Sequence, residues 1–201
     1  MRQMILDAFQ HPFRDPQAVR KLLLGAALNI LPVVNLLALG YTLRLLEQVL
    51  GGEEQRLPEW TGLGDLFIRG VKVLLVGSVY MAFPLLLLAA GAGSFLFSIA
   101  ALLSGTFEPM AQVHLARTGQ IWPAFALPQI WAEIQLVLRD YLGALAIWYG
   151  VFFLIALVLS GTAPPLLWIL GSFLGFYLYL FFASLFGRAC SRTRIVGYHP
   201  S

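Results

Sequence analysis

The chain has 201 residues, of which 59% are hydrophobic and 11% are charged. This composition excludes a soluble domain with one core and a solvated surface, because the excess apolar surface needs lipid. The 13 lysine and arginine residues give a formal net charge of +3, but they are scattered between apolar runs. That distribution is typical of membrane orientation and argues against a nucleic-acid-binding face.

Residues 1–21 form an N-terminal segment that we predict to lie on the cytoplasmic side or in the membrane interface. Their first half lacks both the continuous apolar core and the small-residue cleavage site of a signal peptide. Asp15 is predicted to cap a helix that has Pro16 at its first position and begins just before Arg20.

Residues 22–43 are long enough to cross a membrane, but Pro32 interrupts them between Asn29 and Asn35. Proline removes a helical hydrogen bond, and lipid cannot satisfy the freed backbone group. Two topologies therefore remain open. The segment is either a kinked spanning helix or a re-entrant segment that breaks at Pro32, returns, and is enclosed by other helices.

The basic residues discriminate between these topologies. A spanning first segment would separate Arg2, Arg14, Arg20 and Lys21 from the remaining basic residues. A re-entrant segment leaves all 13 on one side of the membrane. The positive-inside rule favours the re-entrant topology, with that side and both termini cytoplasmic in the cell membrane.

Four later segments have the composition and the length, about 20 residues, of helices that cross a hydrocarbon layer of about 30 Å. They are residues 71–90, 94–116, 141–159 and 164–186. The sequence thus predicts an all-α integral membrane protein with about four full transmembrane helices around the proline-broken first segment. A single membrane domain would cover residues 22–187, and residues 188–201 would form a basic cytoplasmic tail.

Short amphipathic helices are predicted on the basic side. The longest has two opposite faces. The apolar face consists of Leu127, Ile130, Trp131, Ile134, Leu138 and Tyr141, and the polar face consists of Gln129, Glu133 and Asp140. This pattern predicts a helix that lies in the membrane interface, with a shorter one around Trp60 and Phe67.

A weak internal symmetry accompanies these elements. A shift of 70 residues places Leu57-Pro58 on Leu127-Pro128 and Arg69 on Arg139. The hydropathy pattern therefore indicates a parallel repeat of about 70 residues.

Several sequence blocks, in their order and spacing, resemble a known family. They include Leu-Gly-Tyr-Thr-Leu-Arg at residues 39–44, Leu-Pro-Glu-Trp at residues 57–60 and Leu-Phe-Ile-Arg-Gly-Val-Lys at residues 66–72. Further blocks that fit are at residues 15–16, 32–35, 109–111 and 116–119. Over nearly its whole length the chain resembles a bacterial and archaeal membrane family known as domain of unknown function 4013. The resemblance implies a multi-pass membrane domain and carries over no catalytic or binding residue.

Glu108 is the first candidate for a functional side chain. It lies nine residues before Arg117, or about 14 Å along a helix, which places it near the membrane midplane. An acid at that depth is expected to have a partner. Asn29 and Asn35 reach a similar depth in the re-entrant topology, so these three residues are a candidate intramembrane polar site for a proton, cation or small solute. The alternative is that Glu108 only stabilises helix packing by a hydrogen bond.

Other residues have mainly structural interpretations. His114, one turn from Arg117, is predicted to be interfacial rather than part of a proton relay. Gly171 and Gly175 form a GxxxG pattern, which is a candidate for close helix packing within the chain or in a dimer. The candidate contacts to anionic lipid, which also serve as topology anchors, are Arg188, Arg192 and Arg194.

The sequence contains no phosphate-binding loop and no zinc-protease or serine-hydrolase motif. We therefore predict a non-enzymatic membrane protein without a catalytic residue, metal or cofactor. Its predicted partners are the lipid bilayer and a larger membrane complex or a homo-oligomer, in which it is an accessory or structural subunit, and nucleic acid is not among them. The alternative function is a small transporter or channel that uses Asn29, Asn35 and Glu108.

Overall fold

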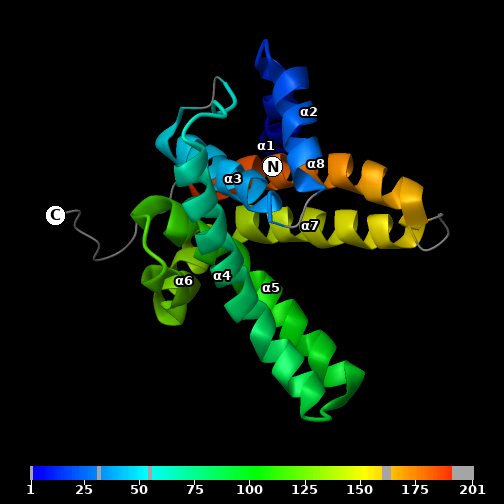
Figure 1. The fold of residues 1–201 in the computed structure, drawn as a ribbon. Helices are drawn as coiled ribbons and strands as arrows, with labels where there is room; N and C mark the ends of the chain where they lie inside the picture. The colour runs from blue at the N-terminus through cyan, green and yellow to red at the C-terminus, as the bar shows by residue number, and fades with distance from the viewer. Residues whose placement is uncertain (1, 31–32, 54–55, 160–163, 192–201) are drawn as a thin grey trace.

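The structure is a computed structural model that describes residues 2–30, 33–53, 56–159 and 164–191. These residues form helices and connecting turns, with no strand among them (Figure 1). In chain order the elements are α1 (Arg2–Gln10), η1 (His11–Arg14), α2 (Ala18–Asn29), α3 (Asn35–Gly51), α4 (Leu63–Ala89), α5 (Gly93–Thr118), η2 (Trp122–Phe125), α6 (Leu127–Leu136), α7 (Leu138–Leu159) and α8 (Pro164–Cys190).

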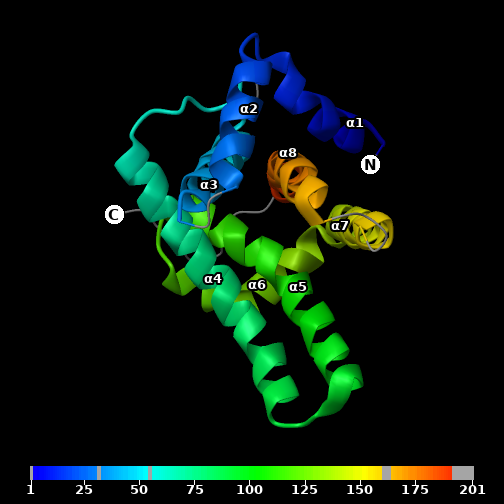
Figure 2. The same ribbon diagram turned by 45° about the vertical axis from the view of Figure 1, so that its right-hand side comes forward.

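Four of the described helices, α4, α5, α7 and α8, are long and apolar enough to cross a membrane. They contain the four predicted spans almost residue for residue, so the all-α membrane fold is confirmed. α4 and α5 form a hairpin that turns at Gly91 and Gly93, whose φ angles of 80° and 77° favour glycine. α7 and α8 lie side by side in both views (Figures 1 and 2), and Figure 1 shows them running away from that hairpin.

The segment that follows α3 returns to the start of α2. The Nζ of Lys21, in the first turn of α2, donates to the carbonyl of Leu57, beyond the end of α3, at 3.0 Å. The backbone N–H of Leu57 in turn donates to the carboxylate of Asp15 at 3.0 Å. The loop after α3 therefore lies against the first turn of α2, and the choice between a re-entrant and a kinked spanning segment stays a prediction. The predicted break at Pro32 itself lies outside the described residues.

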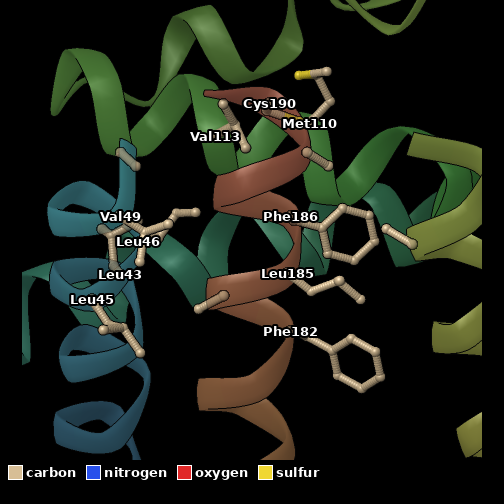
Figure 3. Packing of buried hydrophobic residues seen from close by; sticks show 14 of the residues in the cluster. Leu43, Leu45, Leu46, Val49, Met110, Val113, Phe182, Leu185, Phe186 and Cys190 are labelled. Carbon is tan, nitrogen blue, oxygen red and sulfur yellow. The ribbon is translucent and has the colours of Figure 1, made fainter. Parts of the chain in front are cut away.

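α8 is the central helix of the fold. In its most apolar window 67% of the residues are buried, against 11% in α4 and 17% in α7, so α8 supplies the core while α4 and α7 face outward. Figure 3 shows the side chains that α3, α5 and α8 contribute to this core, among them Leu46, Met110 and Phe186. In a membrane protein the exposed apolar side chains of α4 and α7 are suited to contact lipid.

The segment between α5 and α7 differs from the prediction of one continuous interfacial helix. α6 ends at Leu136, and α7 begins at Leu138 after a break at Val137. Glu133, predicted on the exposed polar face, is only 1% exposed. The physical reason is an ion pair with Arg117 of α5 beside the ring of His114, described below, which turns Glu133 inward.

The same connector runs along the outside of α4. Lys72 donates to the carbonyl of Gly119 at 2.7 Å, and the hydroxyl of Tyr80 donates to the carbonyl of Ala124 at 2.8 Å. These two contacts are eight residues apart on α4, or about 12 Å along its axis. From Gly119 at the end of α5 the chain therefore turns back, so that η2 lies closer to the tip of the α4–α5 hairpin than the end of α5 does.

Candidate functional site

Glu108 lies in the middle of α5 and lines a cavity of about 160 Å³. Residues of α3, α4, α5, α7 and α8 surround this cavity, and most of them are apolar. The aromatic and polar members of the lining are Thr42, Glu108, Gln112, Trp148, Tyr179, Phe182 and Phe186. None of the lining residues is basic, so the lining offers the carboxyl group no cationic side chain.

The hydrogen-bond partner of Glu108 is Gln112, one turn further along α5. The Nε2 of Gln112 donates to Oε1 of Glu108 at 2.8 Å and to the carbonyl of Val73 at 3.3 Å. Gly77 of α4 lies nearby, because a Cβ atom built on it would be 3.9 Å from Oε1 of Glu108. The carboxyl group is thus held by an amide of its own helix and has room toward α4.

Pro109 interrupts the hydrogen-bond ladder of α5 next to Glu108, and Tyr141 bridges the ladder one residue later. The hydroxyl of Tyr141 accepts from the N–H of Met110 at 3.2 Å and donates to the carbonyl of Thr106 at 2.7 Å. In an uninterrupted helix those two backbone groups would pair with each other. The predicted loosening of the backbone by Pro109 is therefore accompanied by a buried tyrosine that binds both groups.

The two asparagines of the predicted polar site lie elsewhere. Asn29 donates from Nδ2 to the carbonyl of Ser172 in α8 at 3.1 Å, and the hydroxyl of Ser172 donates to the carbonyl of Ala26 at 3.2 Å. Asn35 is the first residue of α3. Neither asparagine is among the residues that line the cavity. The structure thus places Glu108 in a cavity with Gln112 and assigns Asn29 to the contact between α2 and α8.

The predicted packing and lipid-binding residues lie along α8. A Cβ atom built on Gly175 would be 3.4 Å from Nδ2 of Asn29, whereas one built on Gly171 would meet no described atom within 4 Å. Arg188 is half-buried in the last turn of α8. Arg192 and Arg194 lie outside the described residues.

A buried ion-pair cluster at the end of α5 was not predicted. Nε2 of His114 lies 3.1 Å from Oε1 of Glu133, and Arg117 donates to Oε2 of the same carboxylate at 3.0 Å. Nδ1 of His114 lies 3.1 Å from the carbonyl of Pro123, and Arg117 also donates to the carbonyl of Cys190. His114, predicted to be interfacial, is fully buried. The cluster connects α5 to η2, α6 and the end of α8, and the helical pattern gave no signal for it, because that pattern placed Glu133 on the polar face.

A second unpredicted cluster surrounds Lys21. Its ammonium group donates to Asp15 at 2.9 Å, to Glu59 at 2.6 Å and to the carbonyl of Leu57 at 3.0 Å, which uses all three of its protons. The carboxylate of Asp15 also accepts from the N–H of Gln17, at 2.7 Å. α2 begins only at Ala18, so Asp15 orders the turn before the helix and is not its N-cap as predicted.

The environment of this cluster shifts two pKa values. Burial raises the pKa of Asp15, but hydrogen bonds from Lys21 and from the N–H groups of Gln17 and Leu57 outweigh burial and hold it below 3.8. Burial lowers the pKa of Lys21, and hydrogen bonds to Glu59 and Asp15 outweigh that effect and raise it above 10.5. Both groups are therefore stabilised in their charged forms.

Comparison with known proteins addresses the family of the chain. The model of a family described as "Protein of unknown function (DUF4013)" matches residues 23–163, more than half of the chain. The chain belongs to this family. No curated protein and no solved structure matches it. The DUF4013 match includes Glu108, Gln112 and the His114–Glu133 pair, whereas the aromatic residues that α8 contributes to the cavity lie beyond its end.

Proposed function

We propose that this DUF4013 protein is a non-enzymatic accessory subunit that packs with lipid and with other membrane proteins through its transmembrane helices. The observation that supports this role is the exposure of three of the four spans. Only 11%, 28% and 17% of the residues in the apolar windows of α4, α5 and α7 are buried within the chain. Large apolar side chains such as Leu86, Phe95 and Phe153 remain exposed and available to other helices or to acyl chains.

Mass spectrometry of the protein extracted into native nanodiscs tests this role. We expect stoichiometric protein subunits to be recovered with the chain. Gly171→Leu should reduce their recovery if α8 contributes to the contact, since no described atom of the chain lies within 4 Å of that position. Gly51→Leu at the end of α3, which is equally open but lies outside the four spans, is the matched control. A monomer recovered with lipid alone would contradict the accessory role.

We propose further that both termini are cytoplasmic. Arg44 pairs with Asp65 at 2.9 Å and Lys72 binds Gly119, so the basic end of α3, the start of α4 and the end of α5 share one side of the fold. The opposite tip, around Gly91, carries no lysine or arginine. A cysteine introduced at Ala92 should react with an impermeant maleimide in intact cells, and one at Glu53 only in inverted vesicles. The reverse pattern would overturn the orientation.

A second candidate function, transport of a small solute, is favoured by the cavity at Glu108. An acid inside a membrane-spanning helix is a functional hypothesis by default. If the cavity carries flux, Glu108→Gln should abolish transport while the protein still folds, because the change removes only the charge and the exchangeable proton. Unchanged flux in Glu108→Gln would exclude transport through this site.

A further inference from the structure

We propose that the cavity around Glu108 is a binding site for a small organic ammonium ion. The inference goes beyond the packing role and requires no flux, because it concerns binding alone. For the transport alternative it names the class of substrate. It rests on the hydrogen-bond pattern of Glu108 and Gln112, on the aromatic residues of the lining, and on the size of the cavity.

The side-chain oxygens of Glu108 and Gln112 accept hydrogen bonds, and the amide nitrogen of Gln112 has no proton left to donate. Both protons of Gln112 Nε2 are directed at acceptors, Oε1 of Glu108 and the carbonyl of Val73. Because only the amide nitrogen can donate to both, these two contacts fix the orientation of the amide. The Oε1 atom of Gln112 is then buried without a donor. A ligand that matches this site has to donate hydrogen bonds, and an ammonium group has three donors and no acceptor.

Aromatic side chains from two other helices complete the recognition of a cation. The ring centroid of Trp148 lies 4.3 Å from that of Phe182 and 6.2 Å from that of Phe186. All three rings line the cavity, and Figure 3 shows Phe182 and Phe186 on the same side of α8. A cation within about 6 Å of such rings is attracted by their negative faces. The lining thus combines a carboxylate and aromatic faces without a positive side chain.

The size of the cavity favours an organic cation over a bare metal ion. Its volume of about 160 Å³ is close to the ~150 Å³ of a protein cavity that holds benzene. A metal ion would leave most of that volume empty, and no group of three histidine, cysteine, aspartate or glutamate residues occurs in the described part of the chain. The ammonium group belongs either to a soluble amine with an apolar body or to the ethanolamine headgroup of a lipid.

Calorimetric titration of the full chain with 2-phenylethylammonium tests the proposal. The protein is held in phosphatidylcholine nanodiscs, which contain no primary amine, and empty nanodiscs provide the blank. We expect saturable binding to the native chain that weakens at least tenfold in Glu108→Gln. Glu53→Gln, which removes the same charge from an exposed position, is the matched control and should bind like the native chain.

Two further measurements use the native chain, so the test does not depend on whether Glu108→Gln folds. 2-Phenylethanol, which has the same body and no charge, should bind the native chain at least tenfold more weakly than the ammonium ion. Loss of 2-phenylethylammonium binding in phosphatidylethanolamine nanodiscs would assign the ammonium group to the lipid headgroup, and retention would assign it to a soluble amine. Equal binding of the charged and neutral probes, displacement by sodium ion alone, or no saturable binding would overturn the proposal.

Discussion

Gly40 of α3 and Gly70 of α4 lie against each other at the point where these helices cross. A Cβ atom built on Gly40 would be 1.8 Å from the carbonyl oxygen of Leu66 and 3.0 Å from the backbone nitrogen of Gly70. A Cβ atom built on Gly70 would be 1.8 Å from the carbonyl oxygen of Leu36. The contact is reciprocal and antiparallel, and it brings the backbones of the two helices together as small residues do in membrane helix packing.

Gly40→Ala is therefore expected to destabilise the fold. The added methyl group meets backbone atoms that cannot rotate away, so α3 and α4 have to separate, at a cost of about 3 kcal/mol in the free energy of unfolding. Gly70→Ala should have a similar effect. Unfolding in mixed micelles, followed by circular dichroism, measures the loss. Gly64→Ala, also in α4 but with no atom within 4 Å of its Cβ position, should leave stability unchanged, and equal stability of all three variants would contradict the contact.

A second prediction concerns the tyrosine that bridges α5. Tyr141→Phe removes the hydroxyl that binds both Met110 N–H and Thr106 C=O and should reduce the free energy of unfolding by about 1 to 3 kcal/mol. Tyr149→Phe is the matched control, because the bond that its hydroxyl donates, to the carbonyl of Leu102, lies in a more exposed position. The loss should be larger for Tyr141→Phe, and the reverse order would contradict the bridging role.

The sequence predicts the spans well because hydropathy is a local property. Residues 164–186 are apolar whatever they pack against, and α8 duly begins at Pro164. The same signal does not distinguish the core side of a helix from its lipid side, because lipid is as apolar as leucine. In α6 the apolar face predicted to lie in the membrane interface divides accordingly: Trp131 and Leu127 are about half exposed, whereas Ile130 is buried, as is Glu133 of the predicted polar face.

The depth of a residue in the membrane, which the sequence predicts, likewise does not determine which helix its side chain faces. Asn29 and Glu108 were predicted to share a polar site because the re-entrant topology places them at a similar depth in the membrane. The structure pairs Asn29 with α8 and Glu108 with Gln112, a contact within one helix turn. The partner of Glu108 was therefore visible in the sequence as a glutamine four residues later, whereas the choice of facing helix depends on packing that no local pattern encodes.

The buried carboxylate of Glu133 leads to a third prediction. Glu133→Gln leaves Arg117 and His114 without their shared carboxylate in a buried site, and this should cost about 3 to 5 kcal/mol in the free energy of unfolding. Asp140→Asn removes an acid from the first turn of α7 and should cost less than about 1 kcal/mol. Thermal unfolding of both variants in detergent measures the difference, and a Glu133→Gln protein as stable as the native chain would show that the cluster is dispensable.

The last prediction follows from the Lys21–Asp15 pair and concerns pH. Because the pKa of Asp15 is lower in the folded chain than in the unfolded chain, its contribution to stability is complete above about pH 4 and is lost as pH falls through the folded pKa. The raised pKa of Lys21 has the opposite sign, so its contribution is complete below about pH 10 and is lost as pH rises further.

The stability of Asp15→Asn should therefore fall less steeply as the pH is lowered than that of the native chain. At neutral pH the native chain should be the more stable of the two. Thermal unfolding between about pH 3 and pH 7 compares the two proteins. The difference between their melting temperatures should shrink as the pH falls, since protonation of Asp15 in the native chain imitates the substitution. Arg20→Met, which removes an exposed charge beside Lys21, is the control and should retain the native pH dependence. A constant difference across this range would mean that Asp15 does not titrate with folding, and it would remove the ion pair as the link between α2 and Leu57.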